Sequence, residues 1–135
     1  MFTYILDSSA WLIHIFKEPG ADHITRLFKD EDNRVAVSAL SLVEVYTRLK
    51  SVKREKEFAK LTEFYSYLFH SFIPATEAVV MQAVEIRRAT TSRVPSIDAI
   101  IAATTSLEGA VLLHRDAHFL SIPDALLQQQ MLGEA

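Results

Sequence analysis

The sequence predicts an α/β fold in which a short parallel sheet of about four to five strands is surrounded by helices. Short apolar runs alternate along the chain with longer segments in which apolar residues recur every three or four positions. Such alternation is typical of parallel strands joined by helical crossovers. The chain has 135 residues, half of them hydrophobic, so we expect residues 1–135 to form one domain with a buried core.

The first half of the chain begins with a short buried strand that ends at Asp7. Pro19 and Gly20 end the helix after it, and Ser38 is predicted to cap the helix that follows the second strand. In order, the pattern predicts a strand at 2–6, helices at 8–17 and about 21–30, a strand from 34, a helix to about 50 and a helix at 53–70.

The second half of the chain continues the alternation. A short strand at 71–75 precedes a helix that Thr76 is predicted to cap and that extends to about Ala89. Ser96 is predicted to cap the apolar helix "IDAIIAATTSL", which ends at Gly109 because glycine readily takes a left-handed backbone. The strand "AVLL" follows. The last segment, "ALLQQQML", fits either an edge strand or a short helix.

Four acidic residues stand just after predicted strands or early in the helices that follow them: Asp7, Glu44, Asp98 and Asp116. Ligands of open α/β sheets bind beyond the carboxyl ends of the strands, so we expect these side chains to converge there. Carboxylates that lie close together raise one another's pKa unless a cation neutralises them. Oxygen ligands suit Mg²⁺ or Mn²⁺, and a cation held in this way is what phosphodiester hydrolysis requires.

Each acid also has a purely structural interpretation. Asp7 and Asp116 could cap helices, and Asp98 could lie at a helix N-terminus, where negative charge is stabilising in any protein. Glu44 could form a surface ion pair with Arg48, four residues later on the same helix. The metal-site interpretation therefore depends on all four acids occupying matching places in the predicted topology.

Several other classes of site are excluded or disfavoured. The absence of cysteine excludes disulfides, thiolate zinc sites and cysteine nucleophiles. Three scattered glycines do not form the glycine-rich turns of P-loop or dinucleotide-binding folds. Phosphatases that form an aspartyl phosphate carry a second aspartate where this chain has Ser9, and receiver domains need a second acid and a late lysine. Because the net charge is −3, binding of a polyanion must depend on local cations or on metal ions.

The N-terminus lacks the basic region of a signal peptide, and no apolar run approaches the roughly 18 residues of a membrane span. We therefore expect a cytoplasmic protein without membrane contact.

The four acidic stretches together resemble a PIN-domain ribonuclease, and within that superfamily the VapC-type toxins of toxin–antitoxin modules. The stretches are "YILDSSAWL", "VSALSLVEVYTRL", "SIDAIIAAT" and "LLHRDAHF", and their order and spacing are similar to the family along the whole chain. The resemblance implies a PIN-like fold, a Mg²⁺- or Mn²⁺-dependent endoribonuclease, a homodimer and a small antitoxin protein as partner.

Carried over by position, the resemblance implies that Asp7 and Asp98 are the principal metal ligands. Glu44 and Asp116 would complete the site by holding a second metal or ordering water, and Ser8, beside Asp7, would assist through its hydroxyl or backbone. The chain departs from the family pattern at His114, where many relatives carry threonine. His114 and His118 together could suggest a pair of metal ligands, but His114 ends a strand and the segment between them is short. We therefore expect both to be polar residues at the rim of the site.

An RNA substrate also needs cations near the site, and the nearest predicted ones are Arg87, Arg88 and Arg93, just before the Asp98 helix. The apolar helices at 39–70 offer a docking surface for an antitoxin, whose arginine would enter the acidic site in place of the metal. Two alternatives remain open: a PIN nuclease that processes RNA without a toxin role, and a catalytically silent PIN domain that only binds a partner.

Overall fold

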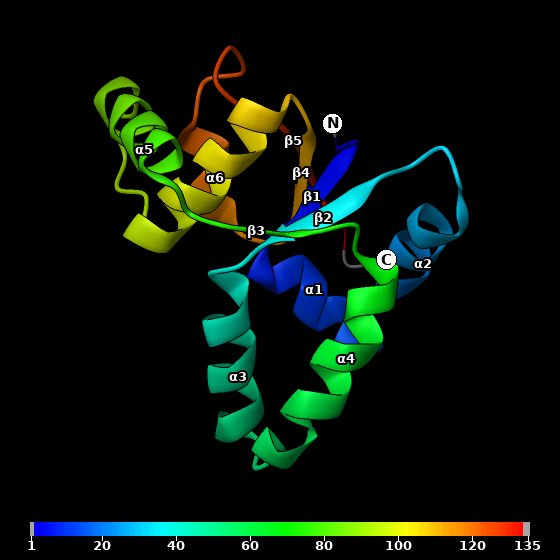
Figure 1. The fold of residues 1–135 in the computed structure, drawn as a ribbon. Coiled ribbons are helices and arrows are strands. Elements are labelled where there is room, and N and C mark those ends of the chain that lie inside the picture. Colours follow the sequence, from blue (N-terminus) through cyan, green and yellow to red (C-terminus); the bar gives the residue numbers. More distant parts are fainter. Residues whose placement is uncertain (1, 134–135) are drawn as a thin grey trace.

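Five parallel strands form one sheet in the order β3-β2-β1-β4-β5 in the computed structural model, which describes residues 2–133 (Figure 1). The strands are β1 (Tyr4–Leu6), β2 (Val35–Ser38), β3 (Phe72–Ile73), β4 (Val111–His114) and β5 (Gln128–Met131). The predicted α/β fold with a parallel sheet is confirmed, and the last segment is the edge strand β5 rather than a helix.

Helices connect the strands and cover the sheet. They are α1 (Ser8–Ile15), α2 (Ala21–Lys29), α3 (Ser41–Ser51), α4 (Phe58–Leu68), α5 (Glu77–Ala89) and α6 (Ser96–Glu108), with short 3₁₀ helices η1 (Glu55–Glu57) and η2 (Ala117–Ser121). Within residues 2–133, none of these helices is both long enough and apolar enough to cross a bilayer.

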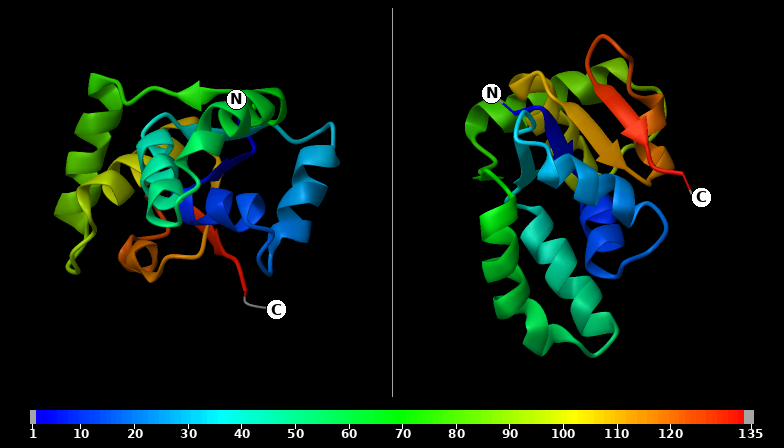
Figure 2. Two further views of the ribbon diagram at one scale, coloured as in Figure 1. Left: turned by 90° about the horizontal axis from the view of Figure 1, so that it is seen from below. Right: turned by 90° about the vertical axis from the view of Figure 1, so that its right-hand side faces the viewer.

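The sheet separates two hydrophobic cores, because successive side chains of a strand point to opposite faces. In β1, Ile5 packs in the core that α5 and α6 cover, whereas Leu6 packs in the core of α1 to α4. Leu112 and Leu113 of β4 divide in the same way. Figures 1 and 2 show these two groups of helices on opposite sides of the sheet. The central strands are therefore buried on both faces, which explains their continuous apolar sequences.

Two of the predicted helix ends are confirmed. Thr76 caps α5, and its side chain accepts a hydrogen bond from the backbone N–H of Val79 at 3.4 Å. Gly109 ends α6 with a left-handed φ of 64°, which glycine adopts without steric penalty.

The predicted caps Ser38 and Ser96 are wrong. Ser38 is the last residue of β2, and its hydroxyl accepts from the N–H of Leu40 in a turn that delays the start of α3 to Ser41. Ser96 is already the first residue of α6, with Pro95 in the capping position. The carbonyl of Pro95 accepts the N–H of Ala99 at 2.9 Å, so the helix begins one residue earlier than the serine signal indicates.

The predicted helix over 53–70 is interrupted near its start. Lys53 has a positive φ of 60°, and η1 follows before α4 begins at Phe58. As a result the chain reverses, and α3 and α4 lie as a pair that projects from the sheet (Figures 1 and 2). The rings of Tyr46 and Phe58, 5.3 Å apart, join the two helices near this reversal.

Candidate metal centre

The acidic residues lie at the carboxyl end of the sheet, where the order of the strands reverses. β1 lies between β2 and β4. Asp7 directly follows β1, and its backbone N–H donates to the carbonyl of Leu113 in β4 at 3.0 Å. Asp116 follows β4 by two residues, and Asp98 lies in the first turn of α6. This switch point is where open α/β sheets bind their ligands.

Asp7 is almost fully buried, with 3% of its surface exposed. Its Oδ1 accepts the N–H of Ala10 at 2.8 Å, so the residue does cap α1. The hydroxyl of Ser9 donates to the same carboxylate at 2.7 to 2.8 Å and accepts the N–H of Arg115 at 2.9 Å. Burial raises the pKa of Asp7 to about 7, opposed by these hydrogen bonds and reinforced by the charges of Asp98 and Asp116.

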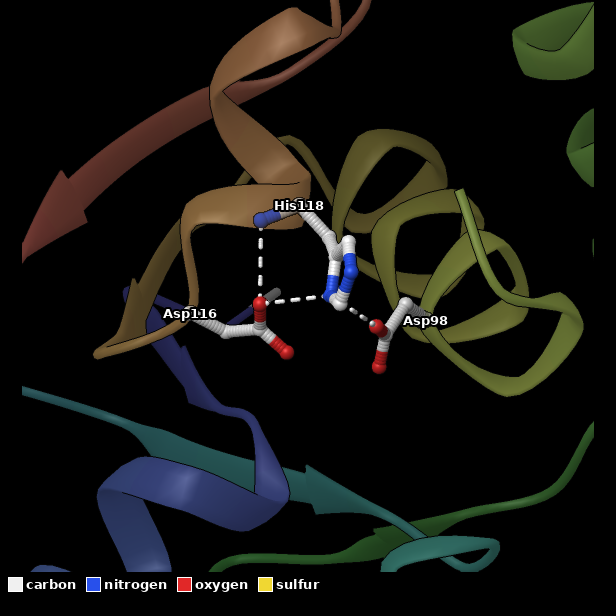
Figure 3. A group of neighbouring side chains, drawn as sticks. All are labelled: Asp98, Asp116 and His118. Atoms are coloured by element: carbon white, nitrogen blue, oxygen red, sulfur yellow. Dashed lines mark hydrogen bonds and ion pairs between the residues drawn. The ribbon is translucent and has the colours of Figure 1, made fainter. Parts of the chain in front are cut away.

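Asp98, Asp116 and His118 form a close group at the opening of the site (Figure 3). The His118 Nδ1 lies 2.8 Å from Asp116 Oδ1 and 3.7 Å from Asp98 Oδ2. Burial raises the pKa of Asp98 to about 6, and the charges of Asp116 and Glu44 raise it further, whereas His118 lowers it. The carboxyl of Asp98 therefore senses charge from two other acidic residues of the predicted set.

Glu44 is oriented by a buried serine pair. Ser8 donates a short hydrogen bond to Glu44 Oε1, and the Ser8 and Ser41 hydroxyls lie 3.0 Å apart. Because each hydroxyl carries one proton, Ser41 donates to Ser8 while Ser8 donates to Glu44. The predicted alternative, an ion pair between Glu44 and Arg48, is not found among the residues that the structure describes.

The orientation of α3 explains why Glu44 was harder to place from the sequence. A helical wheel places Val43 and Tyr46 on the main apolar stripe of this segment, together with Leu42 and Leu49, which predicts that they are buried. Their exposed fractions are nevertheless 64% and 39%. Val45 and Leu49 face the core instead, which brings Glu44 to the half-buried side of the helix. The exposed apolar residues of α3 therefore have the same spacing in the sequence as residues that face a core.

The two histidines of the "HRDAHF" stretch have different roles. His114 is fully buried, so the prediction that it lies at the rim is wrong. Its Nδ1 accepts the N–H of Asp116 at 3.1 Å, which leaves Nε2 to donate to Gln129 Oε1 at 2.8 Å. Burial lowers the pKa of His114, which agrees with a neutral ring whose Nδ1 accepts a hydrogen bond. Through its bond to Gln129, the ring connects β4 to β5. His118, with 55% of its side chain exposed, does lie at the rim.

The predicted arginines differ in their distance from the acids. Arg93 lines a hollow of about 240 Å³ together with Asp116 and His118. Arg87 donates to the Ser96 hydroxyl at the start of α6, at 3.3 Å. Arg88 pairs with Glu85 on the exposed face of α5 and does not border this hollow.

Sequence reasoning missed the part that His118 plays beside the acids and the contact of Ser41 with Ser8. A usable signal for His118 was present: an aspartate that caps a short helix places the residue two positions later above its own carboxylate, as Asp116 does. No comparable signal existed for Ser41, because its contact joins positions 33 residues apart.

The donor set fits a divalent cation. It offers carboxylate oxygens from several segments, and one ligand atom each from Asp98, Asp116 and His118 lies within 4.8 Å of the others. Asp7 brings a buried carboxyl whose ionised form a cation would stabilise. Asp7, Asp98 and Asp116 could hold the ion, with Glu44 at its border.

Comparison with protein families agrees with this geometry. A profile of the PIN domain matches residues 4–125, a range that includes all four acids. The chain belongs to the PIN-domain family. The family consists of nucleases that generally use divalent metal ions. The resemblance read from the four acidic stretches is therefore confirmed at the level of the family.

Solved structures share the fold of this PIN domain at low sequence identity. A chain of VapBC2 from Rickettsia felis, bound to a promoter DNA fragment, matches with a TM-score of 0.78 and 19% identity over 97% of this chain and 99% of that one. A chain of DNA-bound VapBC from Salmonella typhimurium matches with a TM-score of 0.76 and 16% identity, over 98% of this chain and 100% of that one. A chain of FitAcB from Neisseria gonorrhoeae matches with a TM-score of 0.73 and 20% identity, over 94% of this chain and 96% of that one. No curated protein matches the sequence.

Proposed function

We propose that this PIN domain is a metal-dependent endoribonuclease that hydrolyses RNA phosphodiester bonds, and that it is the toxin of a type II toxin–antitoxin system. The observation that carries the proposal is the position of Asp7. Its carboxyl is buried at the switch point of the sheet, and its pKa is raised to about 7. A buried acid flanked by two further acids opposes folding unless a cation joins it, which favours a functional role over a structural one.

The residues of the site divide the work of hydrolysis. When bound, Mg²⁺ or Mn²⁺ supplies a water nucleophile of lowered pKa and neutralises charge at the phosphate. Asp7, Asp98 and Asp116 would hold the ion. Glu44, oriented by the hydroxyl of Ser8, would align the attacking water and accept its proton. The bond between phosphorus and the leaving 3′ or 5′ oxygen would break opposite the entering oxygen, and the leaving oxygen would take a proton from solvent.

Arg93 would bind the RNA backbone beside the scissile phosphate, since it borders the hollow that Asp116 and His118 also line. Arg87, at the start of α6, would bind a neighbouring phosphate. Arg88 is already paired with Glu85, so its contribution to RNA binding would be smaller.

The toxin assignment is supported by the neighbours, several of which are VapBC or toxin–antitoxin complexes. By analogy, an antitoxin protein would dock on the α3–α4 pair, where Val43, Phe64 and Tyr67 are exposed. An antitoxin arginine would then enter the acidic site in place of the metal. We also propose that the protein forms a homodimer, as the resemblance implies.

Cleavage of a mixed RNA pool tests the proposed activity. We expect cutting with Mg²⁺ or Mn²⁺, and its loss with EDTA and in Asp98→Asn. The matched control is Asp32→Asn, an exposed loop aspartate, which should cut like the wild type. Cutting that persists in EDTA would contradict the metal-dependent mechanism. A folded protein that cuts no RNA in the pool, whatever the metal, would favour the catalytically silent alternative.

Binding of the antitoxin requires its own test. The candidate is a small protein encoded beside this gene, and the assay compares its affinity for the wild type and for Asp7→Asn. If an arginine enters the acidic site, Asp7→Asn weakens binding, because one charge of the pair is lost. Equal affinity would contradict the inserted arginine while leaving the docking surface possible. RNA cleavage without any antitoxin gene nearby would favour a processing nuclease.

A further inference from the structure

The imidazole of His118 has no role in the hydrolysis described above, although it stands among the acids (Figure 3). Its Nδ1 is 2.8 Å from Asp116 Oδ1 and 3.7 Å from Asp98 Oδ2. In octahedral coordination with bonds of about 2.1 Å, adjacent ligand atoms are about 3 Å apart. The spacing between His118 and Asp116 thus matches that of adjacent ligands around one cation, and the ligand atoms of all three side chains lie within 4.8 Å of one another.

We propose that His118 is a nitrogen ligand of this metal centre and makes it select Mn²⁺ over Mg²⁺. The inference rests on the proposed function, and it narrows the two candidate ions to one. Carboxylate oxygens suit both ions. Mg²⁺ is harder and keeps to oxygen ligands, whereas Mn²⁺, as a first-row transition-metal ion, gains more than Mg²⁺ from a nitrogen ligand. One histidine among the carboxylates should therefore increase the affinity of the site for Mn²⁺ more than its affinity for Mg²⁺.

His118 lies close to the acids because Asp116 caps the short helix η2 that contains it. Asp116 caps η2, and its Oδ1 accepts the backbone N–H of His118 at 2.9 Å. This bond fixes the backbone of His118, so its side chain reaches across to Asp98 at the start of α6 (Figure 3). The nitrogen that faces both carboxylates is Nδ1, the atom that would bind the metal after losing its proton.

His118 can exchange a hydrogen bond for a metal bond with little structural cost. More than half of its side chain is exposed, so the ring can shift without disturbing the core. His114, by contrast, is fully buried and engages both ring nitrogens, in contacts with Asp116 and Gln129. Among residues 2–133, the group of potential ligands includes His118 and no other histidine.

Calorimetric titration with Mn²⁺ and with Mg²⁺ tests the inference on the full-length protein. We expect the wild type to bind Mn²⁺ at least about tenfold more tightly than Mg²⁺. In His118→Ala, Mn²⁺ affinity should fall by about tenfold or more while Mg²⁺ affinity changes by less than about threefold. His118→Asp restores a ligand, but as oxygen, so it should bind both ions with a reduced preference for Mn²⁺. His70→Ala, at an exposed histidine elsewhere, is the matched control and should keep the wild-type ratio.

A spectroscopic measurement separates direct ligation from a nearby charge. In the Co²⁺-loaded protein, a ligating imidazole shows a strongly shifted ring N–H proton signal, expected in the wild type and in His70→Ala but absent in His118→Ala. An unchanged Mn²⁺:Mg²⁺ ratio in His118→Ala, with binding still abolished by Asp98→Asn, would overturn the role of His118 and leave the proposed nuclease intact. Absence of any metal binding by the folded wild type would overturn both.

Discussion

Asp7 and Trp11, one turn apart at the start of helix α1, are buried in sharply different surroundings. At its start, Asp7 is buried as an acid beside other acids, and its pKa is raised to about 7. One turn later, Trp11 is fully buried among aromatic rings, with Tyr65 at 5.5 Å and Phe69 at 5.3 Å, both edge to face. The first burial opposes stability and the second provides it. The contrast favours a role in chemistry for Asp7 and a role in stability for Trp11.

Substitutions at Asp7 and Trp11 should therefore affect activity and stability differently. Removing the charge of Asp7 should abolish cleavage and increase the stability of the metal-free protein. Removing apolar surface at Trp11 should lower the stability and leave cleavage per folded molecule unchanged.

Asp7→Asn should lower RNA cleavage by about a thousandfold or more, because a neutral amide binds a divalent cation poorly. Asparagine caps helices as well as aspartate does, so the start of α1 should be preserved. The measurement is initial cleavage rate at saturating Mn²⁺, with circular dichroism to confirm the fold. A variant with more than a tenth of wild-type activity would remove Asp7 from the site.

Trp11→Ala should lower the free energy of unfolding by about 3 to 5 kcal/mol, since a large side chain is lost from a packed core. Trp11→Phe is the matched control. It keeps an aromatic ring and removes the indole N–H, which has no hydrogen-bond partner within residues 2–133, so it should cost much less. Urea unfolding measures both. Cleavage per folded molecule should be unchanged in Trp11→Phe, and a large loss there would link the aromatic core directly to chemistry.

The metal-free protein should become less stable as the pH rises from about 4 to about 8. The pKa of Asp7 is 3.8 in the unfolded chain and about 7 in the folded protein, so the folded state holds the proton more tightly. The resulting stabilisation is complete below 3.8 and is lost as the pH passes 7, with an upper limit of about 4 kcal/mol. Asp98, whose pKa is raised to about 6, acts in the same direction.

The pH effect is isolated by comparing unfolding free energies of the wild type and Asp7→Asn in EDTA. The difference should be small at pH 4 and should favour Asp7→Asn at pH 8, whereas Asp32→Asn should follow the wild type throughout. A constant difference between pH 4 and pH 8 would show that Asp7 does not titrate in this range.

Ser8→Ala should lower cleavage by about tenfold through loss of the hydroxyl that orients Glu44. The effect should fall on kcat rather than on metal affinity, because Ser8 contacts Glu44 and not the aspartates. Ser66→Ala, at an exposed serine of α4, provides the control. Equal kcat in Ser8→Ala and wild type would assign the serine pair a packing role only.

Much of this contrast could be predicted from the sequence, because it depends on local patterns. The strand before Asp7, the cap at Thr76 and the stop at Gly109 follow from apolar runs and capping chemistry, and the structure has all three. The position of Asp98 in the first turn of a buried helix was equally local. These features required no knowledge of which strands pair.

The remaining features depend on contacts between distant residues. Glu44 could not be separated from a surface ion pair until α3 was placed beside Ser8, 36 residues away. The burial of His114 depends on β5 pairing with β4, and the strand character of that segment was itself ambiguous in the sequence. Tertiary pairing decided these cases, and short-range spacing carries little information about it.

The most direct test of the metal centre is calorimetric titration of the wild type, Asp98→Asn and Asp32→Asn with Mn²⁺ at pH 8. We predict saturable binding to the wild type and to Asp32→Asn, and loss of binding in Asp98→Asn. Equal binding by Asp98→Asn and wild type, or no binding by the folded wild type, would contradict the assignment of this acidic edge as a metal-dependent nuclease site.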